Sequence, residues 1–331
     1  MSGSLTNPPL LKWREEETGP QAVDAVDAAL SCPSPFSFNR STAPGGEHFA
    51  GFDVVITWVN YTMQTGCNDE MRYLLRSLKT FDMYPDHIRK IFVLVADVHG
   101  ESCVPLAGPD YLIEGTAEEE EGPLGVHPSL RIVRHSEVFD KANLPTVSRD
   151  AILAAVPKIK GLGEWFFRFD DDMTLAKTFD VNDWFDVKSQ RMKLHYDRYV
   201  GVSTGCEYSG DEKLFPMSDL VGKTQYKRVM YHSNNVLHTK FGPPKNGPGT
   251  HAGCRKAPDA TDHSALLHNR CIDLIARSMF QKEFKETDKG EEGPDTVHLN
   301  TLMVNLAFQM GMGVWVAGGS QWSCQTGHFS M

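Results

Sequence analysis

The sequence predicts an α/β fold in which a mainly parallel sheet is built from strands that alternate with helices. Short apolar runs rich in β-branched or aromatic residues occur at positions 53–59, 90–97, 130–135 and 165–169. Amphipathic helical patterns lie after the first run and before the last. Such alternation is typical of parallel sheets with right-handed crossovers. No run of about 18 apolar residues occurs, so we expect no membrane-spanning segment.

The first element is a buried strand at residues 53–59, and a helix follows it. Met71, Leu74, Leu75 and Leu78 recur at the spacing of one helical face, and Asn68 can cap this helix. Residues 1–50 are rich in Pro, Ser, Gly and Ala, and we expect an irregular leader there with at most a short helix near 22–30. We expect residues 51–331 to form one domain.

The middle of the chain continues the alternation. The strands at 90–97 and 130–135 flank an insertion with four consecutive glutamates, 118–121, which predicts a solvated loop. Ser148 begins a second helix that reaches Ala154, and the strand at 165–169 runs directly into Asp170, Asp171 and Asp172. Ligands of parallel sheets bind at the carboxyl ends of the strands, so these aspartates, with Asp97, predict a site.

The second half is less regular, and we expect helical additions from about residue 230. A Gly/Pro loop spans 242–254. One helix is predicted from the shared face of Leu267, Cys271, Leu274, Ile275 and Ser278, and another from the apolar pattern at 299–310.

Charge and cysteine content narrow the function classes. The formal net charge is −10, which argues against a nucleic-acid binder. The seven cysteines include no CxxC pair, so they indicate neither a disulfide scaffold nor a zinc site. The beginning of the sequence lacks the pattern of a signal peptide, and the compartment stays open. The absence of GxGxxG and P-loop motifs excludes ordinary dinucleotide and ATP sites.

The three aspartates are the strongest local feature. Hard cations such as Mg²⁺ prefer oxygen ligands, and two carboxylates with substrate phosphates commonly hold them. A charged, solvated turn is the alternative interpretation, but three adjacent carboxylates repel one another.

Two further pairs of residues suit a phosphorylated substrate. Arg72 and Arg76 are four residues apart on the first helix, and a guanidinium group can donate two bonds to a phosphate. A surface face paired with Asp69 and Glu70 is the alternative. His263 and Arg270 are seven residues apart and are predicted to share one helical face, with His263 in the first turn as a neutral base.

Taken together, these segments resemble the Stealth family of sugar-phosphate transferases. The resemblance is carried in order by DVVITWVN, NDEMRYLLRSL, RKIFVLVAD, LRIVRHSEVF, LPTVSRDAI, WFFRFDDDM, SNNVLHTKFG, DHSALLHNR, MFQKEFKET and PDTVHLNTL. It covers roughly residues 52–312. It implies a catalytic domain with a nucleotide-binding sheet of the GT-A glycosyltransferase type.

The resemblance also implies a reaction and its residues. A nucleotide-sugar donor, expected to be a UDP-sugar, would lose sugar-1-phosphate to a glycan hydroxyl and release the nucleoside monophosphate. Asp171 and Asp172 resemble ligands of Mg²⁺ or Mn²⁺, with Asp172 also counted as catalytic, and Asp170 stands where the family usually has Asn. His263 resembles the catalytic histidine and Arg270 its phosphate-side partner. The donor side is assigned to Asp53, Asn60, Asp69, Glu70, Arg72 and Arg76, and Asn234 and Asn235 resemble the acceptor side. A homodimer is a further expectation.

Some positions depart from the family pattern. Asn60 replaces an aspartate, Ala265 replaces a proline, and an arginine expected near Glu292 is missing, with Lys289 as the nearest basic residue. Two alternatives therefore remain: a metal-dependent glycosyltransferase of the GT-A type, which would break the anomeric bond, and a non-catalytic glycan-binding homologue.

Overall fold

The structure is a computed structural model. It describes residues 38–58, 70–84, 86–96, 130–146, 148–170, 173–199, 225–241, 250–251, 254–255, 258–260, 265–290 and 295–317.

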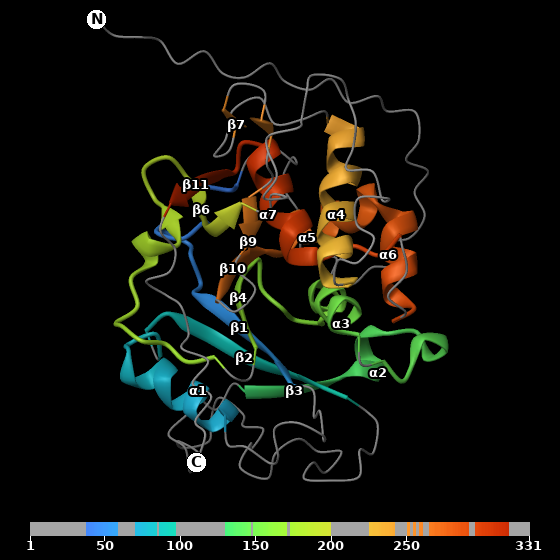
Figure 1. The fold of residues 1–331 in the computed structure, drawn as a ribbon. Coiled ribbons are helices and arrows are strands. Elements are labelled where there is room, and N and C mark those ends of the chain that lie inside the picture. The colour runs from blue at the N-terminus through green and yellow to red at the C-terminus, as the bar shows by residue number, and fades with distance from the viewer. Residues whose placement is uncertain are drawn as a thin grey trace, which may run out of the picture.

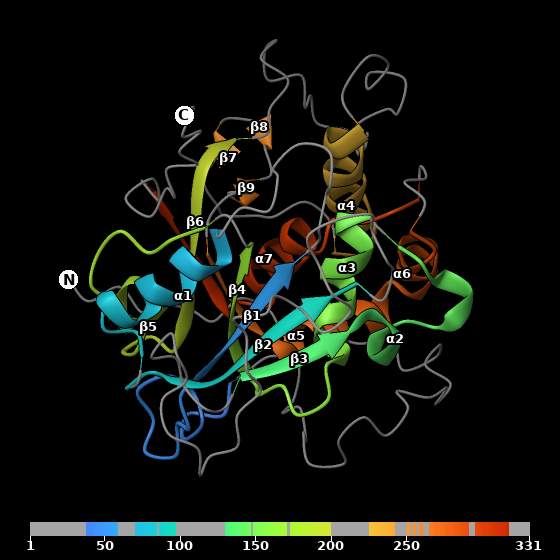
Figure 2. The ribbon, with the colours of Figure 1, turned by 90° about the horizontal axis from the view of Figure 1, so that it is seen from below.

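A central sheet of five strands has the order β10-β4-β1-β2-β3 (Figures 1 and 2). Its four parallel strands are β1 (Phe52–Trp58), β2 (Ile88–Val95), β3 (Leu130–Arg134) and β4 (Trp165–Asp170). The fifth, β10 (Leu266–Asn269), pairs with β4 in the antiparallel direction. The predicted α/β fold with a mostly parallel sheet is therefore confirmed.

Both faces of the sheet are covered by apolar side chains. Val54 and Ile56 belong to one core cluster and Val55 to the other, as expected when successive side chains point to opposite faces. The first cluster includes the apolar face of α1 (Glu70–Thr80), and the second includes that of α3 (Arg149–Ala155). Burial on both faces explains why the strands read as continuous apolar runs.

The structure confirms three predicted helices in outline. All four apolar residues predicted to face the core from α1 are buried. The N-cap of α3 is Ser148, whose side chain accepts a hydrogen bond from the Ala151 amide at 3.3 Å. The last of the three, α7 (Leu299–Gln309), is almost entirely buried. The N-terminal half of the chain also contains three short helices: α2 (His135–Val138), η2 (Lys141–Asn143) and η3 (Val156–Lys158).

The second half contains the expected helices and also a sheet that the sequence did not predict. The remaining helices are α4 (Gln225–Phe241), α5 (Arg270–Met279) and α6 (Gln281–Asp288). The second sheet joins β11 (Gly313–Ala317), β6 (Arg191–Tyr199) and β5 (Phe185–Asp186), with β9 (Pro258–Ala260) also on β6, and η4 (Val181–Asp183) precedes it. The antiparallel pair β7 (Thr250–His251) and β8 (Cys254–Arg255) overlaps the end of the Gly/Pro loop predicted at 242–254. Among the residues described, no helix combines the length and apolarity needed to cross a membrane.

The helix predicted to include Leu267 is wrong in its first part. Leu266–Asn269 form the edge strand β10, and α5 begins only at Arg270. The side chain of Asn269 caps α5 by accepting hydrogen bonds from the amides of Cys271 and Ile272. Pairing with β4 therefore overrides a local helical pattern. Cys271 is disulfide-bonded.

The end of the predicted leader packs against the domain. Residues 38–50 form turns, and within them Phe38 and Ala43 are buried. The Phe38 ring meets the Trp165 ring edge-to-face, with 4.7 Å between centroids. The packed part of the chain therefore includes Phe38, before the expected boundary at residue 51, while the helix considered near 22–30 falls outside the described residues.

Candidate functional site

A cluster of charged side chains gathers where β1 and β4 end. Asp170, the last residue of β4, accepts hydrogen bonds from Arg168 at 2.5 Å and from Arg149 at 2.9 Å. The Thr57 hydroxyl, near the end of β1, lies 3.4 Å from the same carboxylate. This is the edge at which parallel sheets bind ligands.

The two arginines differ in their access to solvent. The Arg168 side chain is 1% exposed, the Asp170 side chain 15% and the Arg149 side chain 39%. Arg168 is therefore fixed within the protein, whereas Arg149 reaches the carboxylate from the solvent side. Because two guanidinium groups already hold Asp170, this carboxylate is poorly suited to bind a metal in addition.

His298 lies beside this cluster at the start of α7. Its Nδ1 atom lies 2.9 Å from the Thr301 hydroxyl and accepts a hydrogen bond from the Thr301 amide at 3.3 Å, so the imidazole caps the helix. Its Nε2 atom lies 3.8 Å from an Asp150 carboxylate oxygen. Burial, with the nearby charges of Arg149 and Arg168, lowers the pKa of His298 to about 3, so the ring is neutral at pH 7.

Helix α4 brings the predicted acceptor-side asparagines toward α7. The Ser233 hydroxyl accepts a hydrogen bond from the His298 amide at 2.8 Å. Asn234 and Asn235 follow Ser233 directly, and both are buried in α4. Four of the segments that carry the family resemblance, LPTVSRDAI, WFFRFDDDM, SNNVLHTKFG and PDTVHLNTL, therefore meet through Arg149, Asp170, Ser233 and His298.

Sequence reasoning did not single out Arg149, Arg168 or His298. The signals for them were indirect: Arg149 follows the helix cap Ser148, and His298 stands just before the apolar pattern of α7 with a threonine three residues later. Neither signal says which carboxylate the residue will meet.

Helix α1 begins on the carboxyl side of the sheet, because it follows the end of β1. Glu70 is its first residue, Arg72 is partly buried and Arg76 is exposed. The donor-side assignment of these residues stays a prediction. Asn60, Asp69, Asp97, Asp171, Asp172 and His263 lie outside the described residues. Within the described part of the chain, no group of three or more His, Cys, Asp or Glu side chains could hold a metal.

Asp53 does not fit the predicted donor side. It is fully buried near the beginning of β1, where it accepts hydrogen bonds from Arg89 at 2.9 Å and 2.5 Å and from the Gly163 amide at 2.6 Å. Burial raises the pKa of Asp53, while Arg89 opposes the shift. Asp53 lies roughly 13 Å along the strand from Thr57. It joins the amino ends of neighbouring strands, away from the edge that holds Asp170.

Arg270 does not fit the predicted phosphate side either. Arg270 is 1% exposed, and its guanidinium donates to the carbonyl oxygens of Pro157 at 2.8 Å and Leu162 at 2.6 Å. The preceding residue, Asn269, pairs with Trp165 at the start of β4. Arg270 therefore lies at the amino end of β4. Because a strand ends at Asn269, a helical face shared by His263 and Arg270 is wrong.

The direction of β10 has a different consequence. Leu266 pairs with Arg168 and Asn269 with Trp165, so β10 runs from the carboxyl end of β4 toward its amino end. Ala265 and the start of β10 therefore lie toward the edge of the sheet where β4 ends with Asp170.

No family model matches the chain. It is 34% identical over 110 residues to the exopolysaccharide phosphotransferase SCO2594 of Streptomyces coelicolor, a match that covers 33% of this chain and 14% of that protein. It is 26% identical over 217 residues to the capsular polysaccharide phosphotransferase SacB of Neisseria meningitidis serogroup A, covering 59% of this chain and 33% of that protein. The matched region thus spans a third or less of the length of these relatives.

Two solved glycosyltransferase structures show a loose overall likeness. The galactosyltransferase LgtC in complex with donor and acceptor sugar analogs aligns with a TM-score of 0.33 and 13% identity, covering 80% of this chain and 73% of that chain. Mouse xyloside xylosyltransferase 1, in its apo form, aligns with a TM-score of 0.34 and 10% identity, covering 82% and 86%. These scores are too low to assign residues. The sequence matches, by contrast, support the resemblance to a Stealth-like family, because the matching relatives are exopolysaccharide and capsular polysaccharide phosphotransferases.

Proposed function

We propose that this protein transfers a sugar-1-phosphate from a nucleotide-sugar, with a UDP-sugar as the expected donor, to a glycan hydroxyl. The acceptor oxygen attacks the phosphorus bonded to the sugar, and His263 takes the hydroxyl proton. The bond from this phosphorus to the oxygen that bridges the two phosphates breaks, and the nucleoside monophosphate leaves with the bonding electrons. The anomeric bond of the sugar stays intact.

The direction of β10 carries this proposal. The start of β10 lies toward the edge where Asp170 ends β4, and His263 precedes the first described residue there, Ala265, by two positions. The proposed ligands Asp171 and Asp172 directly follow Asp170. A base and two carboxylates so close in sequence to neighbouring strand ends support a single site.

Arg149 suits the charge-neutralising role that the resemblance gave to Arg270. Its guanidinium lies at the carboxyl edge and is partly exposed, so it can turn toward an anionic phosphoryl group. Arg72 and Arg76 on α1, together with Asn60, Asp69 and Glu70, are proposed for the donor. Asn234 and Asn235 are proposed for the acceptor.

Asp171 and Asp172 are the residues that would hold Mg²⁺ or Mn²⁺. The donor set fits a hard cation, because it supplies two carboxylates while Asp170 is already held by two arginines. Such an ion would neutralise charge on the donor diphosphate when bound.

The reaction class can be tested with purified protein, a panel of UDP-sugars and an oligosaccharide acceptor. We expect release of UMP and one phosphorus between sugar and acceptor in the product, seen by ³¹P NMR. The Asp171→Ala variant, assayed under the same conditions, is the control that measures breakdown of the donor without catalysed transfer. A phosphorus-free glycoside with equimolar UDP would instead identify a glycosyltransferase, and donor binding without turnover would identify a non-catalytic homologue.

The proposed base has its own test. His263→Ala should lower turnover by about 10²–10⁴-fold, the usual contribution of a positioned base, with little change in donor affinity. His48→Ala is the control, because the His48 side chain is 70% exposed and pairs only with the neighbouring Glu47 among the contacts described. If His263→Ala mainly weakens donor binding, His263 contacts the donor and is not the base.

A further inference from the structure

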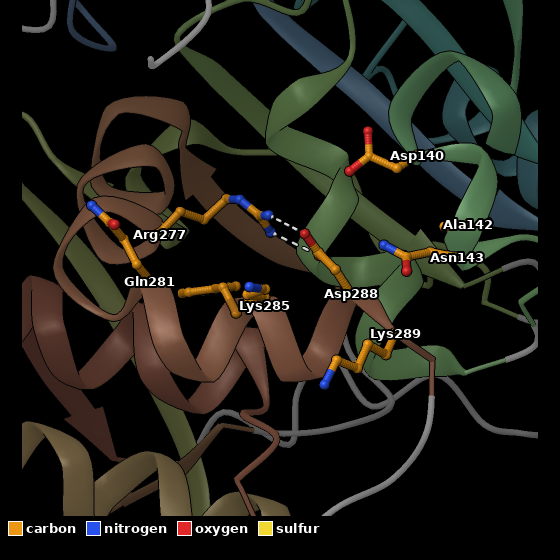
Figure 3. A pocket seen from close by; sticks show the side chains of 9 residues that line it. Asp140, Ala142, Asn143, Arg277, Gln281, Lys285, Asp288 and Lys289 are labelled. Atoms are coloured by element: carbon orange, nitrogen blue, oxygen red, sulfur yellow. Dashed lines mark hydrogen bonds and ion pairs between the residues drawn. The ribbon is translucent and has the colours of Figure 1, made fainter. Parts of the chain in front are cut away.

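A pocket of about 370 Å³ opens between α6 and the segment around η2 (Figure 3). This volume is within the range of small-molecule sites. The pocket is separate from the carboxyl edge of the sheet. Arg277 on its wall donates to the carbonyl of Ala154, at the far end of α3 from Arg149. The two positions are roughly 8 Å apart along the helix axis.

The base of the pocket is fixed by ion pairs. Arg277 donates to both carboxylate oxygens of Asp288, at 2.6 Å and 3.3 Å, and Lys158 contacts Asp288 at 3.0 Å. The Arg277 guanidinium also lies over the Phe284 ring, 4.8 Å from its centroid. These contacts hold α5, α6 and η3 together, so the shape of the pocket does not depend on a ligand.

The rim carries side chains that remain accessible. Gln281 and Lys285 of α6 and its C-cap Lys289 are spaced by four residues, so they share one helical face, and all three are exposed. Lys289 pairs with Glu286 at 2.7 Å, but both side chains are exposed and such a pair exchanges readily with other partners. Asp140 and Asn143 face this row from the opposite side (Figure 3).

This composition selects a class of ligand. The two lysines suit a phosphate group, whereas Gln281, Asn143 and Asp140 offer the amide and carboxylate groups that bond sugar hydroxyls. Phe284 is 2% exposed beneath Arg277, so the described residues that line the pocket offer no aromatic surface on which a nucleotide base could stack. A mixed rim of this kind fits a sugar phosphate better than a bare anion or a neutral sugar.

We propose that this pocket binds a phosphorylated sugar unit of the glycan acceptor, at a distance from the transfer site. The identification of the ligand as part of the acceptor rests on the proposed function, but sugar-phosphate binding itself does not. Transfer to a growing chain would leave phosphate groups in the glycan, and a second contact would hold that chain while its end reaches the site.

The first test is binding to the full chain, followed by NMR of the backbone amides at 140–143 and 281–289. Glucose 1-phosphate should shift these amides, and methyl glucoside should not. Lys285→Glu should lower the affinity for glucose 1-phosphate by about tenfold, the effect expected when a charged hydrogen bond is lost. Lys282→Glu is the matched control, because Lys282 lies on the same helix, is 72% exposed and does not line the pocket.

Several outcomes would overturn the proposal. If Lys285→Glu and Lys282→Glu bind glucose 1-phosphate equally well, Lys285 does not recognise the phosphate group, provided that both variants unfold at the same urea concentration as the wild type. Binding of inorganic phosphate as tight as that of glucose 1-phosphate would remove the sugar recognition. Shifts confined to other residues would remove the site.

A second test separates this inference from the proposed function. Asp171→Ala should abolish transfer and leave glucose 1-phosphate binding unchanged. If the wild type transfers nothing yet binds at the pocket, the proposed function fails and the pocket stands. If transfer occurs but Lys285→Glu leaves the KM for a phosphorylated acceptor unchanged, the pocket is not an acceptor site.

Discussion

Two arginines share the carboxylate of Asp170, and their exposure decides what each can do. Arg168 is buried, so its charge is compensated only inside the protein. Arg149 is partly exposed and can exchange Asp170 for an anionic substrate. The Asp170 carboxylate thus forms a stabilising buried ion pair with Arg168 and positions Arg149 for substrate binding.

The two positions should therefore respond differently to the same change. Arg149→Gln should lower kcat/KM by about 10–100-fold with little loss of stability, because a charged donor near the transferred group is removed. Arg168→Gln should lower the free energy of unfolding by about 3 kcal/mol, because it removes one partner of a buried ion pair. Steady-state kinetics and urea unfolding of both variants give the comparison. Equal stability losses would show that Arg149 is structural too.

His298 makes stability depend on pH. Burial with Arg149 and Arg168 lowers its pKa to about 3, whereas an unfolded histidine titrates near 6.5. Between these values the unfolded chain binds a proton that the folded chain does not, so the free energy of unfolding falls as the pH decreases from 6.5 toward 3. Asp170 opposes the shift only in part, and an Asp150 carboxylate oxygen lies 3.8 Å from Nε2 of the ring.

We expect this loss to be about 2.5 kcal/mol between pH 7 and pH 4.5. His298→Asn keeps a side chain able to cap α7 but removes the titrating ring. Urea unfolding at pH 7, 5.5 and 4.5 should therefore show a flatter dependence for the variant. Parallel profiles for the two proteins would contradict the role of His298.

At the scale of the elements, the local sequence pattern predicted those helices and strands whose conformation depends mainly on neighbouring residues. The strands of the parallel sheet, α1, α3 and α7 follow from apolar periodicity and from caps such as Ser148. The strand β10 did not, because Leu267 has a helical spacing from Cys271 and Leu274 of α5, whereas its own conformation depends on pairing with β4, about a hundred residues earlier. The strands of the second sheet are short or rich in polar residues, so their pairing also depends on distant partners.

The site shows the same division. The segments that meet at Asp170 could be named from the sequence, but the partners of each side chain could not. Asp53 belongs to a strand of the site yet lies at its amino end, and only strand direction with register reveals this. Arg270 has the residue type for phosphate, but burial gives it carbonyl partners instead.

The cap of α3 links an element to the site. Ser148 accepts a hydrogen bond from the Ala151 amide, and Arg149 is the next residue. Ser148→Ala should lower the free energy of unfolding by about 1 kcal/mol and also reduce kcat/KM, because the first turn positions Arg149. Ser148→Asn, which retains a capping oxygen, should recover most of both losses. A stability loss without any kinetic effect would separate the cap from the site.

At the scale of the whole molecule, the C-terminal half completes a sheet begun by the N-terminal half. Arg270 secures this junction, since its amide donates to the Glu164 carbonyl at 2.7 Å and its guanidinium to Pro157 and Leu162. Arg270→Ala should cost about 3 kcal/mol of unfolding free energy and leave the donor KM unchanged in folded protein. Urea unfolding and donor titration distinguish this from a phosphate contact, which would raise the KM instead.

The position of β10 at the edge of the sheet also bears on aggregation. The strand it covers, β4, reads WFFRFD, and Phe166, Phe167 and Phe169 are each at most 1% exposed. Without β10, this aromatic strand would present unpaired backbone groups from Trp165 to Arg168, which is a template for pairing with other chains. During synthesis β4 must wait for about a hundred further residues before its cover is made. Conditions that delay synthesis or folding of the C-terminal half should therefore favour intermolecular β-sheet over soluble protein. The chain would depend on chaperones during that interval.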